Sequence, residues 1–508
     1  MLSKILVLTL IASIGVARSK ADAGEDFRAA RLLIERALDS DAVSSLAVAV
    51  AKDGRTLWAD GYGWSDREGR VKATPDTAYM VGSVTKPMTA MAIMLLEERR
   101  LIDLDRPAND YLGDAKLKGH VGDASDATVA RLLQHTAGLG GHYQVFFSDE
   151  AIKPSPMAQT IASYGNLLWP PGESFRYSNL NYGVLGEIIE RRSGKSYADF
   201  VRDEVFKPLG MRHTCVGLDD RPPGEYATAY GPKYERLPSY RTGHPAAADV
   251  WSSANDLVLF GQAQCRSTQE ASEAAPPVLS GEAARRMQER TVAMGRAMYG
   301  LGWVITTDAA QRRRVRHGGA GAGVGAELSI VPDAGLVVAV LVNGDTSSAV
   351  DGSILPTRVA DAILETLLPV DTESRTVEPN DRKPIETQTT EFDALAGIWK
   401  GSAETLDGPR EVRLWIESAE RIHVRLVDQK TTPLRKTSYT GNTLAGRFSG
   451  ELHDENSSRR PCELELQVCL RGAQLCGALT SISTHPTRGG ALAYWVALER
   501  SDRDAFEK

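Results

Sequence analysis

Ser83 and Lys86 form the only Ser-x-x-Lys pair in the chain and could supply a nucleophile with its base. On a helix, a spacing of three places both side chains on one face, one turn apart. Pro87 is tolerated only near a helix start, so we expect Ser83 in the N-terminal turn, where free N–H groups favour a developing negative charge. A serine needs a neighbouring base to attack, and a desolvated lysine can take its proton. The same spacing also fits a solvent-exposed serine and lysine at a helix cap that have no catalytic role.

Two Tyr-x-Asn triplets could add a phenol and an amide to such a site. Tyr164 and Asn166 have no turn signal around them, and we interpret this triplet as structural. Tyr177 and Asn179 follow a Pro-Pro-Gly-Glu turn and precede an amphipathic run. Two residues apart on an irregular or extended segment, both side chains can point into one cleft.

A third motif, His317-Gly318-Gly319, precedes a strand-like run and is followed by Ala320 and further glycines. Backbone without side chains lets a substrate approach and pair along the strand edge. The alternative His120-Val121-Gly122 lies early in the chain, in a polar loop, and is disfavoured.

The elements that must position these motifs follow the order sheet, helices, sheet. A helix is expected over 25–40, a hairpin over 45–63 with Asp53-Gly54 at its turn, helical runs with Pro/Gly loops over 100–290, and strands over 313–343. This order predicts one large domain over 24–370, whose sheet is built from both of its ends.

A second unit is expected after a polar linker over 371–390, which has two prolines and no apolar periodicity. About eight short alternating segments follow within 391–508, which is typical of a small closed antiparallel barrel. No catalytic constellation is visible there, so we assign this unit a packing or substrate-gating role.

Composition excludes several function classes. The 508 residues are 42% hydrophobic and 25% charged, as in a soluble globular protein. The net charge of −7, without a long basic run, disfavours nucleic acid as a partner. Beyond the N-terminus no apolar stretch approaches the roughly 20 residues of a transmembrane helix, so no integral membrane partner is expected. Oligomeric state stays open.

The N-terminus reads as an export signal over residues 1–23. Lys4 precedes an apolar stretch from Ile5 to Val16, and a small-x-small site ends at Ala23. We therefore expect cleavage near Ala23 and a periplasmic or secreted mature protein, with an uncleaved anchor as the alternative.

An oxidising destination would make the five cysteines candidates for disulfides. Cys469 and Cys476 flank a two-residue hairpin turn and would sit directly opposite, at roughly 5.5 Å between Cα atoms. A cross-strand disulfide and two buried thiols both fit this register. Cys215 could pair with Cys265, which would leave Cys462 alone. None of the five has the short paired spacing of a zinc site.

The three ordered motifs together resemble the serine β-lactamase and penicillin-binding-protein-like hydrolases, closest to the class C branch. The surroundings match too, as in GSVTKPMTA (82–90), PPGESFRYSNLNYGVLGEIIE (170–190) and YGLGW (299–303), and the resemblance covers about residues 28–367. It implies a β-lactamase-like α/β (α+β) fold, in which an antiparallel sheet flanked by helices joins an all-helical region with the site between them. The appended barrel is similar to the C-terminal lipocalin-like domains of D-aminopeptidases.

The resemblance also implies a role for each motif residue, with no metal or organic cofactor required. His135, in LLQHTAGL, is interpreted as a brace of its loop and not as a catalytic group. The implied roles are nucleophile for Ser83, shared general base for Lys86 and Tyr177, orientation of Lys86 and the substrate amide for Asn179, substrate binding for His317 and Gly319, and an oxyanion hole from the backbone N–H groups of Ser83 and Ala320.

Position 317 departs from many β-lactamases, which carry a lysine there to attract the substrate carboxylate. A histidine is mostly neutral at pH 7. We therefore expect an exported serine hydrolase that cleaves an ester or a D-amino-acid amide or peptide bond. β-Lactamase or DD-carboxypeptidase activity is the alternative, and a non-catalytic protein that binds peptidoglycan or acyl ligands is the alternative of another class. The substrate is not readable from the sequence.

Overall fold

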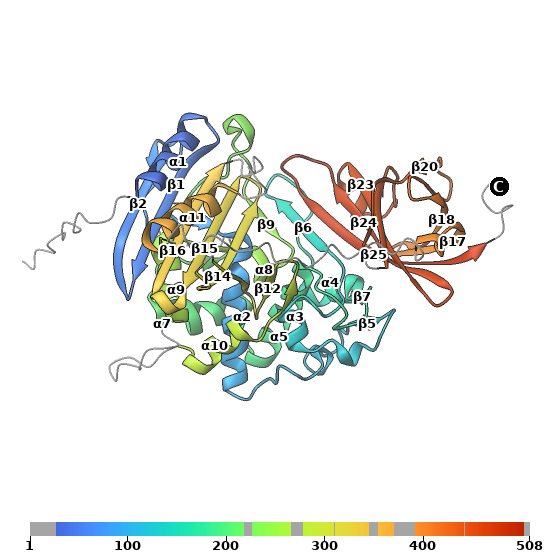
Figure 1. Ribbon diagram of the computed structural model, residues 1–508, viewed down its shortest axis with the longest axis horizontal. Helices are drawn as coiled ribbons and strands as arrows, with labels where there is room; N and C mark the ends of the chain where they lie inside the picture. The colour runs from blue at the N-terminus through green and yellow to red at the C-terminus, as the bar shows by residue number, and fades with distance from the viewer. Residues whose placement is uncertain are drawn as a thin grey trace, which may run out of the picture.

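A nine-stranded antiparallel sheet dominates one half of the molecule (Figure 1). The computed structural model describes residues 27–217, 226–265, 278–308, 310–344, 354–369, 392–440 and 442–501. In spatial order the strands are β11 (Val292–Met294), β12 (Ala297–Tyr299), β13 (Val304–Thr307), β14 (Arg313–Gly321), β15 (Val324–Val331), β16 (Leu336–Gly344), β1 (Val43–Lys52), β2 (Arg55–Asp66) and β3 (Val71–Lys72). Because β1 pairs along its length with β16, the sheet is built from both ends of this half, as predicted.

Both faces of this sheet are covered, which explains the unbroken apolar runs of its central strands. Every residue of β16 is buried, and alternate side chains enter two separate cores. Val338 and Val340 pack with helices α1 (Arg28–Asp39) and α11 (Leu355–Leu367), whereas Ala339 and Leu341 belong to the core that contains α9 (Ala254–Cys265).

A mainly helical region packs against the second face. Helix α2 (Thr85–Glu98) lies between the sheet and α5 (Asn179–Ser193), and its residues from Thr85 to Leu96 are all buried. The other helices here are α3 (Val129–Leu133), α4 (Met157–Tyr164), α6 (Tyr197–Val201), α7 (Lys207–Leu209), α8 (Pro245–Ala248) and α10 (Gly281–Glu289). Short strands complete it, namely β4 (Tyr79–Met80), β10 (Val250–Ser252) and β8 (Cys215–Val216) in one sheet and the parallel pair β5 (Lys118–Gly119) and β7 (Asn166–Leu167).

The C-terminal sheet is a nearly closed antiparallel barrel. Eight of its strands match the predicted segments, and a two-residue strand, β20, was not predicted. In spatial order they are β20 (Thr432–Pro433), β19 (Arg421–Leu426), β18 (Gly408–Ser418), β17 (Gly397–Thr405), β25 (Gly490–Ser501), β24 (Gln474–Ser483), β23 (Cys462–Arg471), β22 (Thr443–Phe448) and β21 (Arg435–Thr440).

Strand β6 (His142–Phe147) joins the two halves and was not predicted (Figure 1). Its first residues pair with barrel strand β25, from His142 opposite Leu492 to Gln144 opposite Gly490. Its last residues pair with β9 (Tyr240–Thr242) of the helical region. The barrel therefore shares one strand with the rest of the molecule in addition to the covalent connection.

Several sequence predictions meet the structure only in part. The signal over 1–23 and the linker over 371–390 lie outside the described residues. Cys469 and Cys476 are opposite each other, as predicted, and are two thiols, while no disulfide joins Cys215 and Cys265. Among the described residues, no helix is long and apolar enough to cross a membrane.

Candidate active site

Ser83 lies in a short 3₁₀ turn, Gly82–Val84, directly before α2, as the position of Pro87 predicts. Strand β14 presses against this turn at Gly319, where an added Cβ would lie 1.9 Å from the carbonyl oxygen of Val81 and 3.1 Å from the backbone nitrogen of Ser83. Only a glycine permits this approach. The close fit also brings Ala320, the next residue of β14, near the serine turn: its backbone nitrogen lies 3.1 Å from the position that a Cβ on Gly82 would take.

Lys86 is completely buried one helical turn after the serine. Its Nζ lies 3.0 Å from Ser83 Oγ, 2.7 Å from Asn179 Oδ1 and 3.1 Å from the carbonyl oxygen of Ala247. Burial penalises the ammonium form and lowers the pKa of Lys86 well below its ordinary 10.5. As a neutral amine, Lys86 has a lone pair that can accept the Ser83 proton, while Asn179 and Ala247 accept its own N–H groups.

Tyr177 approaches the serine from the other side. Its hydroxyl donates to Ser83 Oγ over 2.9 Å, and desolvation raises its pKa above the ordinary 10.0. The phenol therefore keeps its proton at neutral pH, although 42% of the residue is exposed at the rim of the site. Ser83 Oγ thus contacts a group that can take a proton and a group that can give one.

Two hydrogen bonds hold the segment that carries Tyr177 and Asn179. Ser178, between them, donates its backbone N–H to His135 Nδ1 and its hydroxyl to the carbonyl oxygen of Gly140, over 3.3 and 2.6 Å. His135 Nδ1 also lies 3.0 Å from Asn181 Nδ2. The fully buried His135 is thus a hydrogen-bonding brace, which the sequence had assigned to its own loop and which here holds the segment of Tyr177 and Asn179; it lies under the ring of Tyr177 with the ring centroids 4.4 Å apart.

His317 is turned into the protein, and only 4% of it is exposed. Its Nδ1 lies 2.7 Å from the carbonyl oxygen of Gly318, which can only accept, so Nδ1 carries the proton. Nε2, 3.1 Å from the Tyr299 hydroxyl, is then the acceptor. Burial, together with the charges of Lys86 and Arg316, lowers the pKa of His317 to about 3, so the ring is neutral. Position 317 therefore offers no cation to a substrate.

The structure brings all the predicted site residues into one place and adds two that the sequence did not reveal. The carbonyl oxygen of Ala247 holds Lys86, and the Tyr299 hydroxyl hydrogen-bonds Nε2 of His317. A backbone carbonyl carries no sequence signal, whereas Tyr299 lies in the quoted YGLGW segment and was open to recognition. Tyr164, from the triplet interpreted as structural, is buried away from Ser83 and contacts barrel residue Asn456, consistent with that interpretation.

Comparison with known proteins agrees with this geometry. The family model described as Beta-lactamase matches residues 30–361, well over half of the chain. Among curated proteins, Unguisins hydrolase ungD' of Aspergillus campestris is 28% identical over 355 residues, which are 66% of this chain and 64% of that protein. The chain thus spans less than two thirds of the length of this relative.

Solved structures show the same fold. A class C β-lactamase from Rhodobacter sphaeroides has a TM-score of 0.55 at 25% identity, and the match covers 67% of this chain and 99% of that one. The structure of SurE with D-Leu has a TM-score of 0.58 at 22% identity over 94% of this chain and 99% of its own. The second match is therefore long enough to include the barrel.

Proposed function

Since this chain belongs to the β-lactamase family of serine hydrolases, we propose that it is an exported enzyme that cleaves an ester or a D-amino-acid amide or peptide bond through an acyl-enzyme on Ser83. The double contact of Ser83 Oγ, with Lys86 Nζ at 3.0 Å and the Tyr177 hydroxyl at 2.9 Å, carries the catalytic part of this proposal. A hydroxyl held between a desolvated amine and a phenol is set up for nucleophilic attack.

In the proposed acylation, neutral Lys86 takes the proton of Ser83 while Oγ forms a bond to the substrate carbonyl carbon. The resulting oxyanion would be held by the backbone N–H groups of Ser83 and Ala320, an arrangement worth about 2.7–4 kcal/mol per donor. As the carbonyl–nitrogen or carbonyl–oxygen bond breaks, Tyr177 gives its proton to the leaving group and is reprotonated by the Lys86 ammonium. Water then attacks the ester carbon of the acyl-enzyme and reverses these transfers.

The neutral, inward-turned His317 determines which substrates we propose. β-Lactams and peptides that end in D-Ala-D-Ala carry a carboxylate, and an uncompensated charge in a desolvated site is costly. Among the described residues, the basic side chain that contacts Ser83 is the buried Lys86, which is neutral in this proposal and whose hydrogen-bonding contacts are all with protein atoms. An ester or amide without a carboxylate next to the scissile bond avoids this cost. The structure of SurE with D-Leu, a D-amino acid, supports a substrate with a D-residue.

The test uses two substrates that differ only at the carboxylate. An acylated D-Ala-D-Ala peptide and its C-terminal amide are compared by kcat/KM, with a short acyl ester in parallel and Ser83→Ala as the control throughout. We expect the amide to be turned over at least about tenfold faster than the acid, because an uncompensated charge costs more than 1.4 kcal/mol. Equal or faster turnover of the acid would favour a carboxypeptidase.

Intact-mass measurement with a fluorophosphonate separates the enzyme from a binding protein. We expect one adduct on the wild type and none on Ser83→Ala. A wild type that is inert to every acylating agent tried would identify a non-catalytic binder.

A further inference from the structure

Barrel strand β25 contacts the chain shortly after His135 at two buried residues, Gly140 and His142. A Cβ on Gly140 would lie 2.7 Å from the Cβ of Ala493, so the backbone of Gly140 lies directly against this strand. His142 is the residue of β6 that pairs with Leu492 of β25. Both are therefore placed by the barrel, although neither belongs to it.

Gly140 connects the barrel to Tyr177 and Asn179. Its carbonyl oxygen accepts the hydroxyl of Ser178 over 2.6 Å, and Ser178 is 1% exposed. Because Ser178 lies between the phenol and the amide that contact Ser83 and Lys86, a shift of Gly140 moves both contacts.

His142 connects the barrel to Lys86 by a second route. Its Nδ1 lies 2.7 Å from Nε2 of His244, and both rings are buried. Burial and the neighbouring His244 lower the pKa of His142, and burial and Lys86 lower the pKa of His244, so the pair shares a single hydrogen bond between neutral imidazoles. His244 directly precedes α8, and the Ala247 carbonyl of α8 accepts a hydrogen bond from Lys86 Nζ over 3.1 Å.

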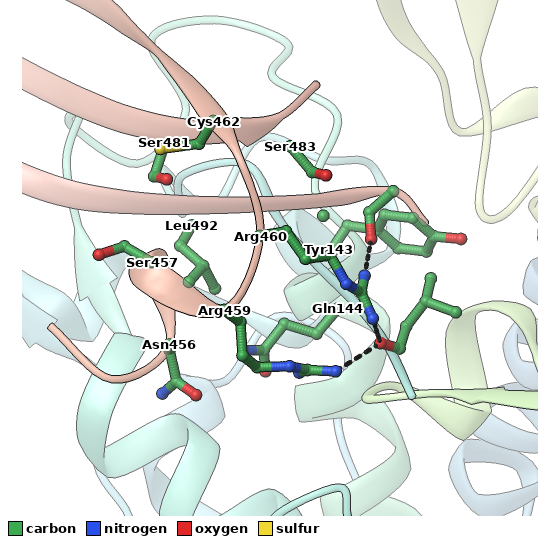
Figure 2. Close-up of a pocket in the computed structure, with 13 residues that line it drawn as sticks. Tyr143, Gln144, Asn456, Ser457, Arg459, Arg460, Cys462, Ser481, Ser483 and Leu492 are labelled. Carbon is green, nitrogen blue, oxygen red and sulfur yellow. Dashed lines mark hydrogen bonds between the residues drawn. The ribbon is translucent and has the colours of Figure 1, made fainter. Parts of the chain in front are cut away.

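Hydrogen bonds from barrel side chains to β6 and to Tyr164 fix the position of the barrel next to Gly140 and His142. Arg459 and Arg460 reach from the barrel to β6 and donate to the carbonyl oxygen of Val145 over 3.0 and 2.7 Å (Figure 2). Tyr164, whose ring lies 4.4 Å from that of His142, accepts a hydrogen bond from Asn456 of the barrel over 2.9 Å.

We propose that Gly140 and His142 are positioning residues through which the C-terminal barrel holds Tyr177, Asn179 and Lys86 in the geometry that Ser83 requires. This inference rests on the proposed acyl-enzyme chemistry. It gives the barrel a part in turnover that does not depend on any contact between the barrel and the substrate.

Two neighbouring glycines provide the experiment. Gly140→Ala drives a methyl group against Ala493 and against the flexible end of Leu168, whereas Gly141→Ala meets nothing within 4 Å. In the full-length protein we expect Gly140→Ala to lower kcat by about tenfold to a hundredfold, as small displacements of catalytic groups do, with a smaller change in KM. Gly141→Ala should stay within about twofold of the wild type, since it adds a methyl group in open space. Adding Ala493→Gly to Gly140→Ala should restore most of the lost kcat.

Each result decides between the possible causes. Wild-type kcat in Gly140→Ala, or an equal loss in both glycine variants, would overturn the proposal. A loss that Ala493→Gly does not rescue would place its origin at Leu168 and remove the barrel from the argument. A wild type that forms no acyl-enzyme would instead refute the proposed function, so the two failures are distinguishable.

A second pair of variants covers the case in which Gly140→Ala does not fold. His142→Phe keeps a ring but loses the hydrogen bond to His244, whereas His142→Asn keeps a polar atom near the position of Nδ1. We expect the Phe variant to lose about tenfold in kcat and the Asn variant to recover part of it. His423→Phe, on barrel strand β19, serves as the control. Unchanged kcat in His142→Phe would overturn the role of the histidine pair.

Discussion

The central sheet and the C-terminal barrel are both antiparallel, yet they bury their strands differently. Strands β15 and β16 are buried at every position, whereas β19 and β22 alternate between buried and partly exposed residues. Helices cover both faces of the first sheet, while the barrel encloses a core on one face and meets solvent on the other.

This difference explains why the site lies in one region and not in the other. Two covered faces create an interior deep enough to desolvate Lys86 fully, and desolvation lowers the pKa of a lysine so that its amine is neutral and can accept a proton. The barrel lysine Lys400, by contrast, has 42% of its side chain exposed and forms an ion pair with Glu411. Strands β24 and β25 are the exception in the barrel, because they are buried over long stretches where they pack on the catalytic half.

The largest predicted effect contrasts two lysines. Lys86→Met should lower kcat by about a thousandfold or more, because it removes the proposed general base. The free energy of unfolding should stay equal or rise, because a buried amine is exchanged for an apolar side chain of similar length. Lys400→Met should change neither quantity, and steady-state kinetics with thermal unfolding measures both. Turnover within tenfold of the wild type in Lys86→Met would contradict its role.

Tyr177→Phe should lower kcat by about a hundredfold, since it removes one proton donor and keeps the ring over His135. Phosphonylation of Ser83 by the fluorophosphonate, which displaces fluoride, should slow in parallel, while the circular dichroism spectrum and the unfolding temperature stay the same. Full turnover by this variant would exclude the phenol from the proton transfers.

Glu150→Gln tests how firmly the barrel is clamped, because Glu150 accepts hydrogen bonds from Arg459, Arg460 and Arg488 of the barrel. We expect it to lower the free energy of unfolding by about 2 kcal/mol at pH 7, the usual worth of hydrogen bonds to a charged group. Glu451→Gln, at an exposed barrel position, is the matched control.

The stability that the contacts between Glu150 and the barrel arginines contribute should fall at low pH. Burial alone would raise the pKa of Glu150, but the hydrogen bond from Arg460 and the neighbouring charges lower it to about 2 from 4.5. A depressed folded-state pKa contributes stability above the unfolded value, and this contribution is lost as the pH falls through about 2. Thermal unfolding of the wild type and the Gln variant should therefore converge below pH 4.5. A constant difference down to pH 2 would reject the assignment.

The smallest expected effect concerns the acid limb of the kcat/KM profile. We assign it to Lys86, whose pKa lies well below 10.5, so activity should rise with pH as this amine loses its proton. The other titratable groups around it stay neutral over that range, because burial raises the pKa values of the tyrosines and lowers those of the histidines; they are Tyr177, Tyr182, His135, His244 and His317. Tyr177→Phe should lower the maximum value of kcat/KM and leave the pH at which kcat/KM rises unchanged. A limb that moves with this substitution would assign the titration to the phenol.

Local spacing made much of the molecule predictable. The Ser83–Lys86 pair depends on one helical turn, and the Cys469–Cys476 register depends on one hairpin, so both follow from fixed backbone periodicities. The order of motifs likewise indicated a sheet built from both ends of its domain, and the structure confirms it.

The contacts between elements were decided only by the tertiary structure. The run His142–Phe147 has strand-like composition, but nothing in it indicates that β25 and β9 are its partners. The sequence likewise shows a histidine at 317, but not that Tyr299 and Gly318 turn its ring inward and keep it neutral. Side-chain types and their spacing along one element are written in the chain, whereas the partners of each group depend on how separate elements pack, and packing is settled only when the whole core forms.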